Sequence, residues 1–219
     1  MTTQPILAWH FVGATLRDGR PIPADGERLE QGGEIIPCQN GFHASERIID
    51  ALKNAPGDTI CRVECSGVVR FHGDPIDKLA SSVRVIQWRV NGEALLRQFA
   101  RECALEVAHL WDMPAIVREY LEAGDESKRY AARAAATGAA ARYAARAAVT
   151  GTAARYASWA AAEAAARYDS WAAASAAAQY AAWAATWAAT WAAARAATWA
   201  AQNARLTALV EAEHARISA

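Results

Sequence analysis

Residues 155–202 read RYASWAAAEAAARYDSWAAASAAAQYAAWAATWAATWAAARAATWAAQ, a run of alanines interrupted at regular intervals by Tyr, Trp and Arg. Two 13-residue segments that each begin RYAAR precede it, over residues 129–154. Alanine is the best helix former, so the whole stretch is expected to be helical. Because 12 residues turn a helix by about 120° beyond whole turns, and 13 residues by about 220°, one straight helix would scatter the tyrosines around its surface. The spacing therefore predicts an all-α array of short helical repeats stacked side by side.

The aromatic residues of this stretch have two interpretations. In the first they fill the gaps between thin alanine helices and mediate self-association, which predicts a homo-oligomer. In the second they form a stacking platform for bases or another flat ligand. The first interpretation is favoured, and it assigns packing roles to Tyr156, Trp159, Tyr168, Trp171, Tyr180, Trp183, Trp187, Trp191 and Trp199.

Composition divides the 219-residue chain near residue 125, because all seven prolines lie before that point. We expect a small α+β domain over residues 1–125, helical repeats over 126–202, and an amphipathic capping helix over 203–219. In the first domain, short apolar or alternating runs predict strands at 6–12, 59–66 and 82–90, with a short edge strand at 34–37. Helices are predicted at 46–53, at 92–110, and between Pro114 and Gly124.

Charge and cysteine content narrow the class of protein. The net charge is zero, which argues against nucleic acid as a partner. Residues 170–194 carry no formal charge and are long enough to span a bilayer, but Trp occurs through their middle, which argues against a membrane partner. A helical element acting on membranes remains a third alternative. Four cysteines make no disulfide scaffold in a chain of this length, so we expect a cytoplasmic protein, in the host cell if it is a phage protein.

Several Cys and His residues of the first domain could carry chemistry. Zinc ligands could come from Cys38, His43, Cys61, Cys65 and His72, but their spacing fits no common zinc module. A Cys–His nucleophile pair is a further alternative. No phosphate-binding or dinucleotide-binding glycine pattern is present, so we expect no metal and no cofactor.

Residues 38–46 read CQNGFHASE, and residues 61–67 read CRVECSG. Over residues 6–90 this resembles an uncharacterised family of phage and bacterial proteins with a Cys-x-x-Gly-Phe-His-x-Cys-Glu line, with Ser45 here in place of the second Cys. The alanine-rich tail resembles the tails of phage or prophage proteins labelled as immunity proteins. The two resemblances imply a non-catalytic phage-type binding protein that acts on a host protein or a nucleotide-type ligand, in counter-defence or host takeover.

A more distant resemblance is to ADP-ribosyltransferases of the poly-ADP-ribose polymerase type. It is carried by Trp9-His10, by the GFHAS line at 41–45, and by VECSG at 63–67, which occur in that order. The resemblance implies an NAD or other nucleotide ligand, with His10 on the nicotinamide ribose and His43 stacked on the ring. Because Ser81 and Ser82 stand where the catalytic Glu is expected, a ligand-binding relative is favoured over an ADP-ribosyltransferase-like enzyme.

The expected ligand-binding residues are therefore His10, Phe42, His43 and Glu64, and the two histidines are also the candidate catalytic residues. A simpler alternative for His10 and His43 is a pair of strand and turn histidines with satisfied hydrogen bonds.

Overall fold

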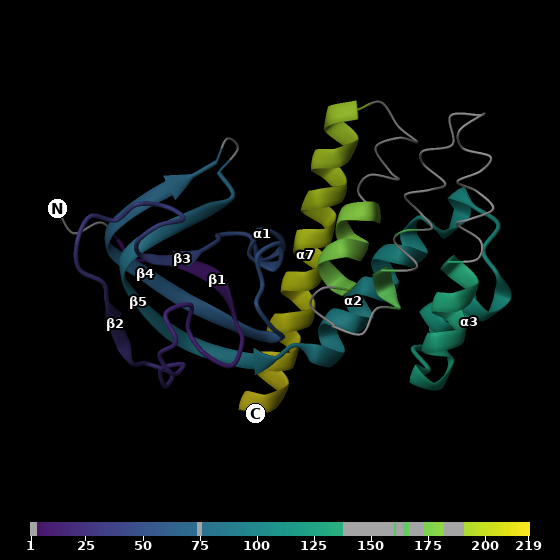
Figure 1. Cartoon of the computed structure of the whole chain (residues 1–219), viewed down its shortest axis with the longest axis horizontal. Coiled ribbons are helices and arrows are strands. Elements are labelled where there is room, and N and C mark those ends of the chain that lie inside the picture. The colour runs from purple at the N-terminus through teal and green to yellow at the C-terminus, as the bar shows by residue number, and fades with distance from the viewer. Residues whose placement is uncertain (1–3, 74–75, 138–159, 161–163, 167–172, 182–190) are drawn as a thin grey trace. The chain divides into compact units, whose positions relative to one another are not determined.

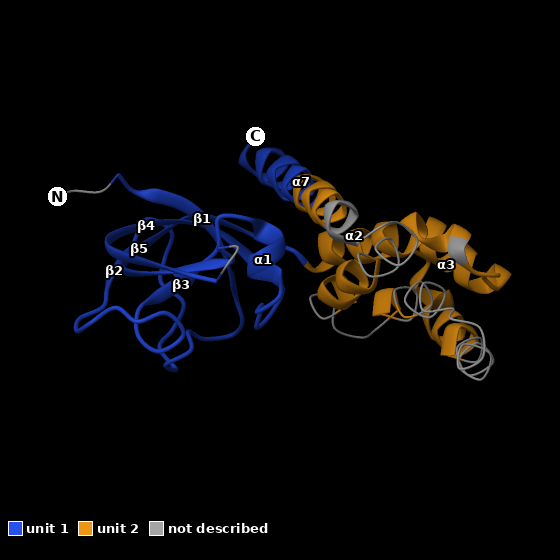
Figure 2. Cartoon of the chain, turned by 90° about the horizontal axis from the view of Figure 1, so that it is seen from above, with its two compact units in different colours: residues 1–92, 206–219 blue, residues 93–205 orange. Residues whose placement is uncertain are grey.

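The computed structural model describes residues 4–73, 76–137, 160, 164–166, 173–181 and 191–219. The chain forms two compact units, which Figure 2 shows in blue and orange. Unit 1 contains residues 1–92 and 206–219, and unit 2 contains residues 93–205. An antiparallel sheet forms the first unit and helices form the second, so the α+β class predicted for the N-terminal region is confirmed at this level.

Unit 1 is organised around two 14-residue antiparallel strands, β4 (Thr59–His72) and β5 (Lys78–Asn91). Strand β1 (Ile6–Val12) pairs with β4, while β2 (Arg28–Glu30) and β3 (Phe42–Ala44) both pair with β5 (Figure 1). Backbone hydrogen bonds of 2.7 and 3.0 Å between Trp9 and Ser45 then join the end of β3 to β1. The strands β1, β4, β5 and β3 therefore curl round a common inner face.

The inner face of this sheet carries the core of unit 1. Strand β4 alternates as predicted, with Cys61, Val63 and Cys65 fully buried. Apolar residues of β1, β3 and β5 complete the same cluster. The short helix α1 (Ile48–Leu52) is also buried.

A bulge at Gly67 changes which residues of β5 face inward. The β4–β5 register shifts between Ser66 and Val69, and Gly67 has a φ of +73°. As a result Leu79, Ser81 and Arg84 all lie on the inner face. In a regular strand only every second residue faces inward, so one residue of β5 is skipped between Ser81 and Arg84. Gly67 therefore forms a β-bulge, which has a direct consequence for the site described below.

Replacing Gly67 by alanine is expected to lower the free energy of unfolding by about 1–2 kcal/mol, because a left-handed φ disfavours any Cβ. A Cβ there would also collide with Ser82 Oγ, which accepts the Val68 N–H. Gly19→Ala is the matched control, because Gly19 has a φ of +84° with open space around it. Urea denaturation should show a larger loss for Gly67→Ala; equal losses would mean that the contact with Ser82 has no effect.

The C-terminal part of α7 (Trp191–Ser218) belongs to unit 1. The His214 ring stacks on Trp88 with centroids 4.0 Å apart and an angle of 5° between planes. Trp88 meets Trp9 edge-on at 5.7 Å, and the Arg62 guanidinium lies 4.5 Å from the centre of the Trp9 ring. We expected residues 203–219 to cap the repeats, whereas residues 206–219 group with the N-terminal sheet.

Unit 2 begins with α2 (Glu93–Glu106), whose apolar stripe is buried as predicted at Leu96, Phe99 and Cys103. The 3-10 turn η1 (Ala108–Leu110), helix α3 (Ala115–Ala123) and the turn η2 (Glu126–Lys128) follow. Gly124 ends α3 with a φ of +68°, as predicted. Residues 129–137 and 173–181 are also helical, and so is the first part of α7.

Described alanines of the repeat region are buried in unit 2. Ala173, Ala174, Ala177, Ala178 and Ala181 have at most 1% of their surface exposed. The buried Gln202 amide of α7 donates to the Ala178 carbonyl at 3.3 Å. These contacts show that residues 173–181 pack alongside α7.

Of the predicted packing aromatics, Tyr180 and Trp199 are partly buried. The backbone of Trp191 lies in α7. The side chain of Trp191 lies outside the described part, as do Tyr156, Trp159, Tyr168, Trp171, Trp183 and Trp187. In the described part of the chain, no helix has both the length and the apolar character needed to cross a membrane.

Tyr120→Phe is expected to lower the free energy of unfolding by about 1 kcal/mol, because it removes a buried hydrogen bond. The Tyr120 hydroxyl donates to the Ala165 carbonyl at 3.2 Å, which ties α3 to the repeat region. Tyr130→Phe is the control, because Tyr130 is 85% exposed. Thermal unfolding should separate the two variants; equal stability would show that the contact with Ala165 contributes nothing.

Three local predictions differ from the structure. The 34–37 segment forms only an isolated bridge between Ile36 and Asn40. The helix predicted at 46–53 is shorter: α1 starts at Ile48, and its N-cap Arg47 makes no side-chain cap hydrogen bond. The 92–110 helix ends at Glu106.

The expected first domain ended near residue 125, whereas the compact units divide at Gly92, so α2 and α3 group with unit 2.

Candidate functional site

Three strands bring three basic side chains together in unit 1. His10 lies opposite Cys61 in the β1–β4 register, so it shares the inner face with that buried cysteine. Arg84 of β5 lies opposite the buried Cys65, on the same face. His43 comes from β3 and is close enough to act electrostatically on His10. The structure therefore brings together the two histidines that the sequence selected, and adds Arg84 to them.

The environment of His10 favours its neutral form. Burial lowers its pKa well below the usual 6.5, and the positive charge of Arg84 and the neighbouring His43 lower the pKa further. The residue as a whole is nevertheless partly exposed. At neutral pH this imidazole is therefore a hydrogen-bonding group without charge.

His43 is also held in a neutral state, and its orientation is fixed. Its Nε2 accepts the Cys38 N–H at 2.7 Å, which assigns the ring proton to Nδ1. Burial lowers the pKa of His43, and the cations Arg17, Lys78 and Arg84 act in the same direction. Cys38 presents its N–H from a left-handed conformation with a φ of +69°, which is uncommon for a residue with a side chain.

Arg84 is the most unusual member of the site. Its residue surface is only 3% exposed, and burial lowers its pKa. Nη1 donates to the His43 carbonyl at 3.4 Å, and the guanidinium lies 5.0 Å from the centre of the Phe42 ring. Nε is buried and has no hydrogen-bond partner among the described residues. A guanidinium stays protonated in proteins, so a positive charge lies in the interior of unit 1.

Sequence reasoning missed Arg84 because its inward orientation depends on the bulge in the neighbouring strand. In the run SVRVIQWRV at 82–90, alternation with Val83 and Val85 gives no hint that Arg84 is buried. The one local signal is Gly67, because an isolated glycine in a strand pattern indicates a bulge or a turn. Only the pairing of β4 with β5 places the bulge opposite Ser82.

The other predicted ligand residues have different positions. Phe42 is buried and lies against Arg84, so it supports the site from within the core. Glu64 lies between two inward-facing residues of β4 and therefore points to the opposite face. There it accepts a hydrogen bond from Gln87 at 3.2 Å, so the structure does not join it to His10 and His43.

The buried cysteines are poor nucleophiles in this setting. Burial raises the pKa of Cys61 to about 11, and it also raises the pKa of Cys65. Among the described residues, no three His, Cys, Asp or Glu side chains are placed to hold a metal ion. The five residues considered above as zinc ligands are therefore not gathered at one point.

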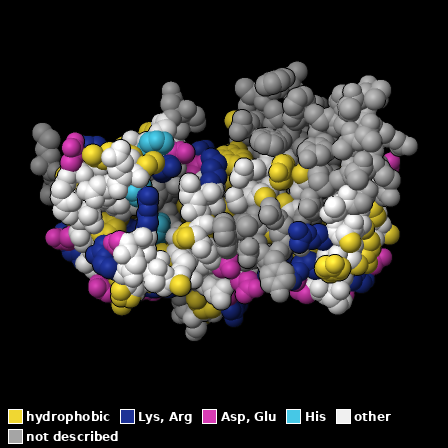
Figure 3. Space-filling model, in the orientation of Figure 1, with side chains coloured by type: hydrophobic (Ala, Val, Ile, Leu, Met, Phe, Trp, Pro, Cys, Tyr) yellow, Lys and Arg dark blue, Asp and Glu magenta, His cyan; other side chains and the backbone are white. Residues whose placement is uncertain are grey.

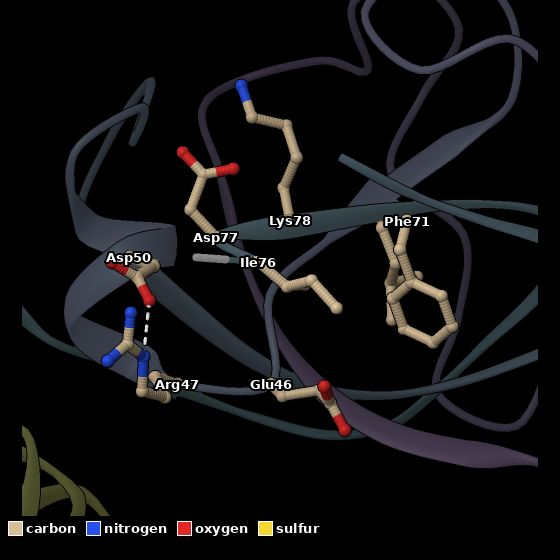
Figure 4. A pocket seen from close by; sticks show the side chains of 8 residues that line it. Glu46, Arg47, Asp50, Phe71, Ile76, Asp77 and Lys78 are labelled. Atoms are coloured by element: carbon tan, nitrogen blue, oxygen red, sulfur yellow. Dashed lines mark hydrogen bonds and ion pairs between the residues drawn. The ribbon is translucent and has the colours of Figure 1, made fainter. Parts of the chain in front are cut away.

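A shallow pocket of about 160 Å³ lies at another part of unit 1, between α1 and the β4–β5 hairpin (Figure 4). Arg47 and Lys53 both pair with the buried Asp50 beside it. Ile76 extends toward Phe71, and both side chains are about half exposed. The pocket lining includes Lys78, which also acts on His43, but it contains none of His10, His43 and Arg84.

Comparison with known proteins gives one match, over the N-terminal part of the chain. Neither the curated proteins nor the solved structures contain a match to this chain. The predicted phage and ADP-ribosyltransferase relationships therefore stay predictions. Residues 6–98, which include His10, His43 and Arg84, match the model of a protein family described as a domain of unknown function (DUF7666).

Proposed function

We propose that the protein is a non-catalytic binding protein whose N-terminal unit holds a small ligand at His10 and His43. The observation that carries this proposal is the convergence of two neutral imidazoles from separate strands beside a buried cation. By surface area both residues are only partly buried, so they belong to the surface of unit 1. Figure 3 shows His side chains next to Lys and Arg side chains on one face of unit 1.

Binding is favoured over catalysis because, among the described residues, no carboxylate forms a hydrogen bond or an ion pair with His10, His43 or Arg84; Asp18 acts on Arg84 only through its charge. NAD-dependent transfer would need an acidic group to stabilise the positive charge that develops on the ribose. Ser81 is buried at the position expected for that group, with its Oγ 2.8 Å from the Val83 carbonyl oxygen. Glu64 lies on the opposite face of β4.

Native mass spectrometry of the full-length protein taken directly from cells tests this proposal. We expect a co-purified small molecule that is retained by the wild type and lost from the double variant His10→Ala/His43→Ala. His109→Ala is the matched control, because His109 is exposed and lies in unit 2. If the double variant retains the molecule as well as the wild type does, the two histidines are not the binding site.

The same preparations test the enzyme alternative. Incubation with NAD should leave NAD unconsumed, because the site has no acidic catalyst. NAD consumption that disappears in the double variant would replace the binding proposal with an enzymatic one.

We also propose that the alanine-rich half mediates self-association, which would make the protein a homo-oligomer. Its support is that the described alanine faces are used for close helix packing. Light scattering of the full chain should show an oligomer, and a strict monomer at all concentrations would contradict this part. A role in counter-defence or host takeover stays a prediction from resemblance alone.

A further inference from the structure

Arg84 has hydrogen-bonding capacity that the protein does not use. Its described hydrogen bond involves Nη1 alone, so no described residue accepts from Nε or Nη2. These two N–H groups lie on one edge of the guanidinium and point in parallel, which is the geometry that binds two oxygens of a carboxylate or phosphate. A buried cation with an unused edge costs free energy unless an anion completes it.

The charges around Arg84 indicate how negative that anion is. Arg17 and Lys78 both act on His43, and neither forms an ion pair among the described residues. Their described hydrogen bonds go to Cys38 instead, to its carbonyl at 3.4 Å and to its Sγ at 3.7 Å. Three cations therefore surround His43 without a carboxylate partner, an arrangement that a dianion neutralises better than a monoanion.

We infer that Arg84, His10 and His43 form a binding site for a phosphate group, with the Nε edge of Arg84 as its innermost contact. The inference rests on the proposed function and names the chemical class of the ligand. The phosphate oxygens accept from Nε and Nη2, and the protonated Nδ1 of His43 is a further donor on the side toward β3. The exposed Arg17 and the partly buried Lys78 provide long-range attraction at the entrance, which is screened by salt.

Phosphate titration of the full-length protein tests this inference, with inorganic phosphate as the probe and sulfate, acetate and chloride at equal ionic strength for comparison. The readout is the ¹H–¹⁵N resonance of the arginine Nε–H groups, in which Arg84 is assigned by its loss in Arg84→Met. We expect this resonance to shift saturably with phosphate, and acetate to require at least a tenfold higher concentration. Arg70→Met is the matched control, because Arg70 is exposed on β4.

Binding measured by calorimetry should weaken at least tenfold in Arg84→Met and stay within twofold of wild type in Arg70→Met. An unshifted Arg84 resonance at saturating phosphate would overturn the inference. If Arg84→Met fails to fold, the loss of the same resonance in Arg84→Lys provides the assignment. A co-purified ligand that is uncharged, and whose binding survives Arg84→Lys, would overturn the phosphate assignment while leaving the histidine site standing. If phosphate binds at Arg84 but no ligand is co-purified from cells, the phosphate site stands and the proposed function loses its support.

Discussion

Arg84→Met is expected to raise the free energy of unfolding in phosphate-free buffer by about 1–4 kcal/mol, the range seen when buried ionic groups are replaced by apolar ones of similar size. Arg84 is 3% exposed and has no described carboxylate partner, so the folded protein carries most of the desolvation cost of its charge. Methionine keeps much of the volume and can still contact the Phe42 ring. Urea denaturation of the full chain measures the difference.

In phosphate, the wild type should instead have a higher free energy of unfolding than Arg84→Met. An anion that binds only the folded wild type stabilises it by mass action, whereas the variant gains nothing. Arg84→Lys serves as the control, because it keeps the positive charge and removes the two parallel N–H donors of Nε and Nη2. If Arg84→Met is instead less stable than wild type in phosphate-free buffer, the bonds to the His43 carbonyl and the Phe42 ring outweigh the desolvation cost, and Arg84 is a structural residue.

Acidification from pH 7.5 to 5.5 should destabilise unit 1 through His10. Its folded pKa lies well below 6.5, because burial and the charge of Arg84 disfavour the imidazolium. Between the unfolded pKa of about 6.5 and the lower folded pKa, the unfolded chain binds a proton that the folded chain does not. The stability contributed by neutral His10 is therefore complete above pH 6.5 and declines as the pH falls toward the folded value.

Urea midpoints at closely spaced pH values measure this slope. His10→Asn should flatten it, and the slope that remains reports His43, whose pKa is lowered in the same direction. His109→Gln is the comparison variant, because it removes an exposed histidine of unit 2. Saturating phosphate should also flatten the slope, because a bound dianion favours the imidazolium. A slope that is identical in His10→Asn and wild type would show that His10 does not titrate in this range.

Local patterns predicted those parts of unit 1 that depend on neighbours in sequence. Strand β1 has the predicted bounds of residues 6–12, and the alternation at Cys61, Val63 and Cys65 gave the correct buried face. Gly67 marked the bulge for a backbone reason, since its φ is positive. These features follow from side-chain periodicity and glycine geometry alone.

Features set by distant pairing could not be predicted in the same way. Ser45 has the residue type of a helix cap, but its backbone bonds to Trp9, 36 positions earlier in the chain. The stack of His214 on Trp88 likewise joins residues that share no local pattern. In the site, resemblance selected His10 and His43, whereas the burial of Arg84 follows from the β4–β5 register.

Anomalous diffraction from crystals of the full-length protein soaked in tungstate, a heavy tetrahedral dianion that mimics phosphate, tests the central claim most directly. The site described here predicts an anomalous peak within hydrogen-bond distance of Arg84 Nε, on the side where His10 and His43 converge. The peak should be absent from Arg84→Met crystals and present in Arg70→Met crystals. The claim that Arg84 binds an anionic ligand would be contradicted by a map with no peak there, in which Arg84 Nε donates to an oxygen of the protein itself.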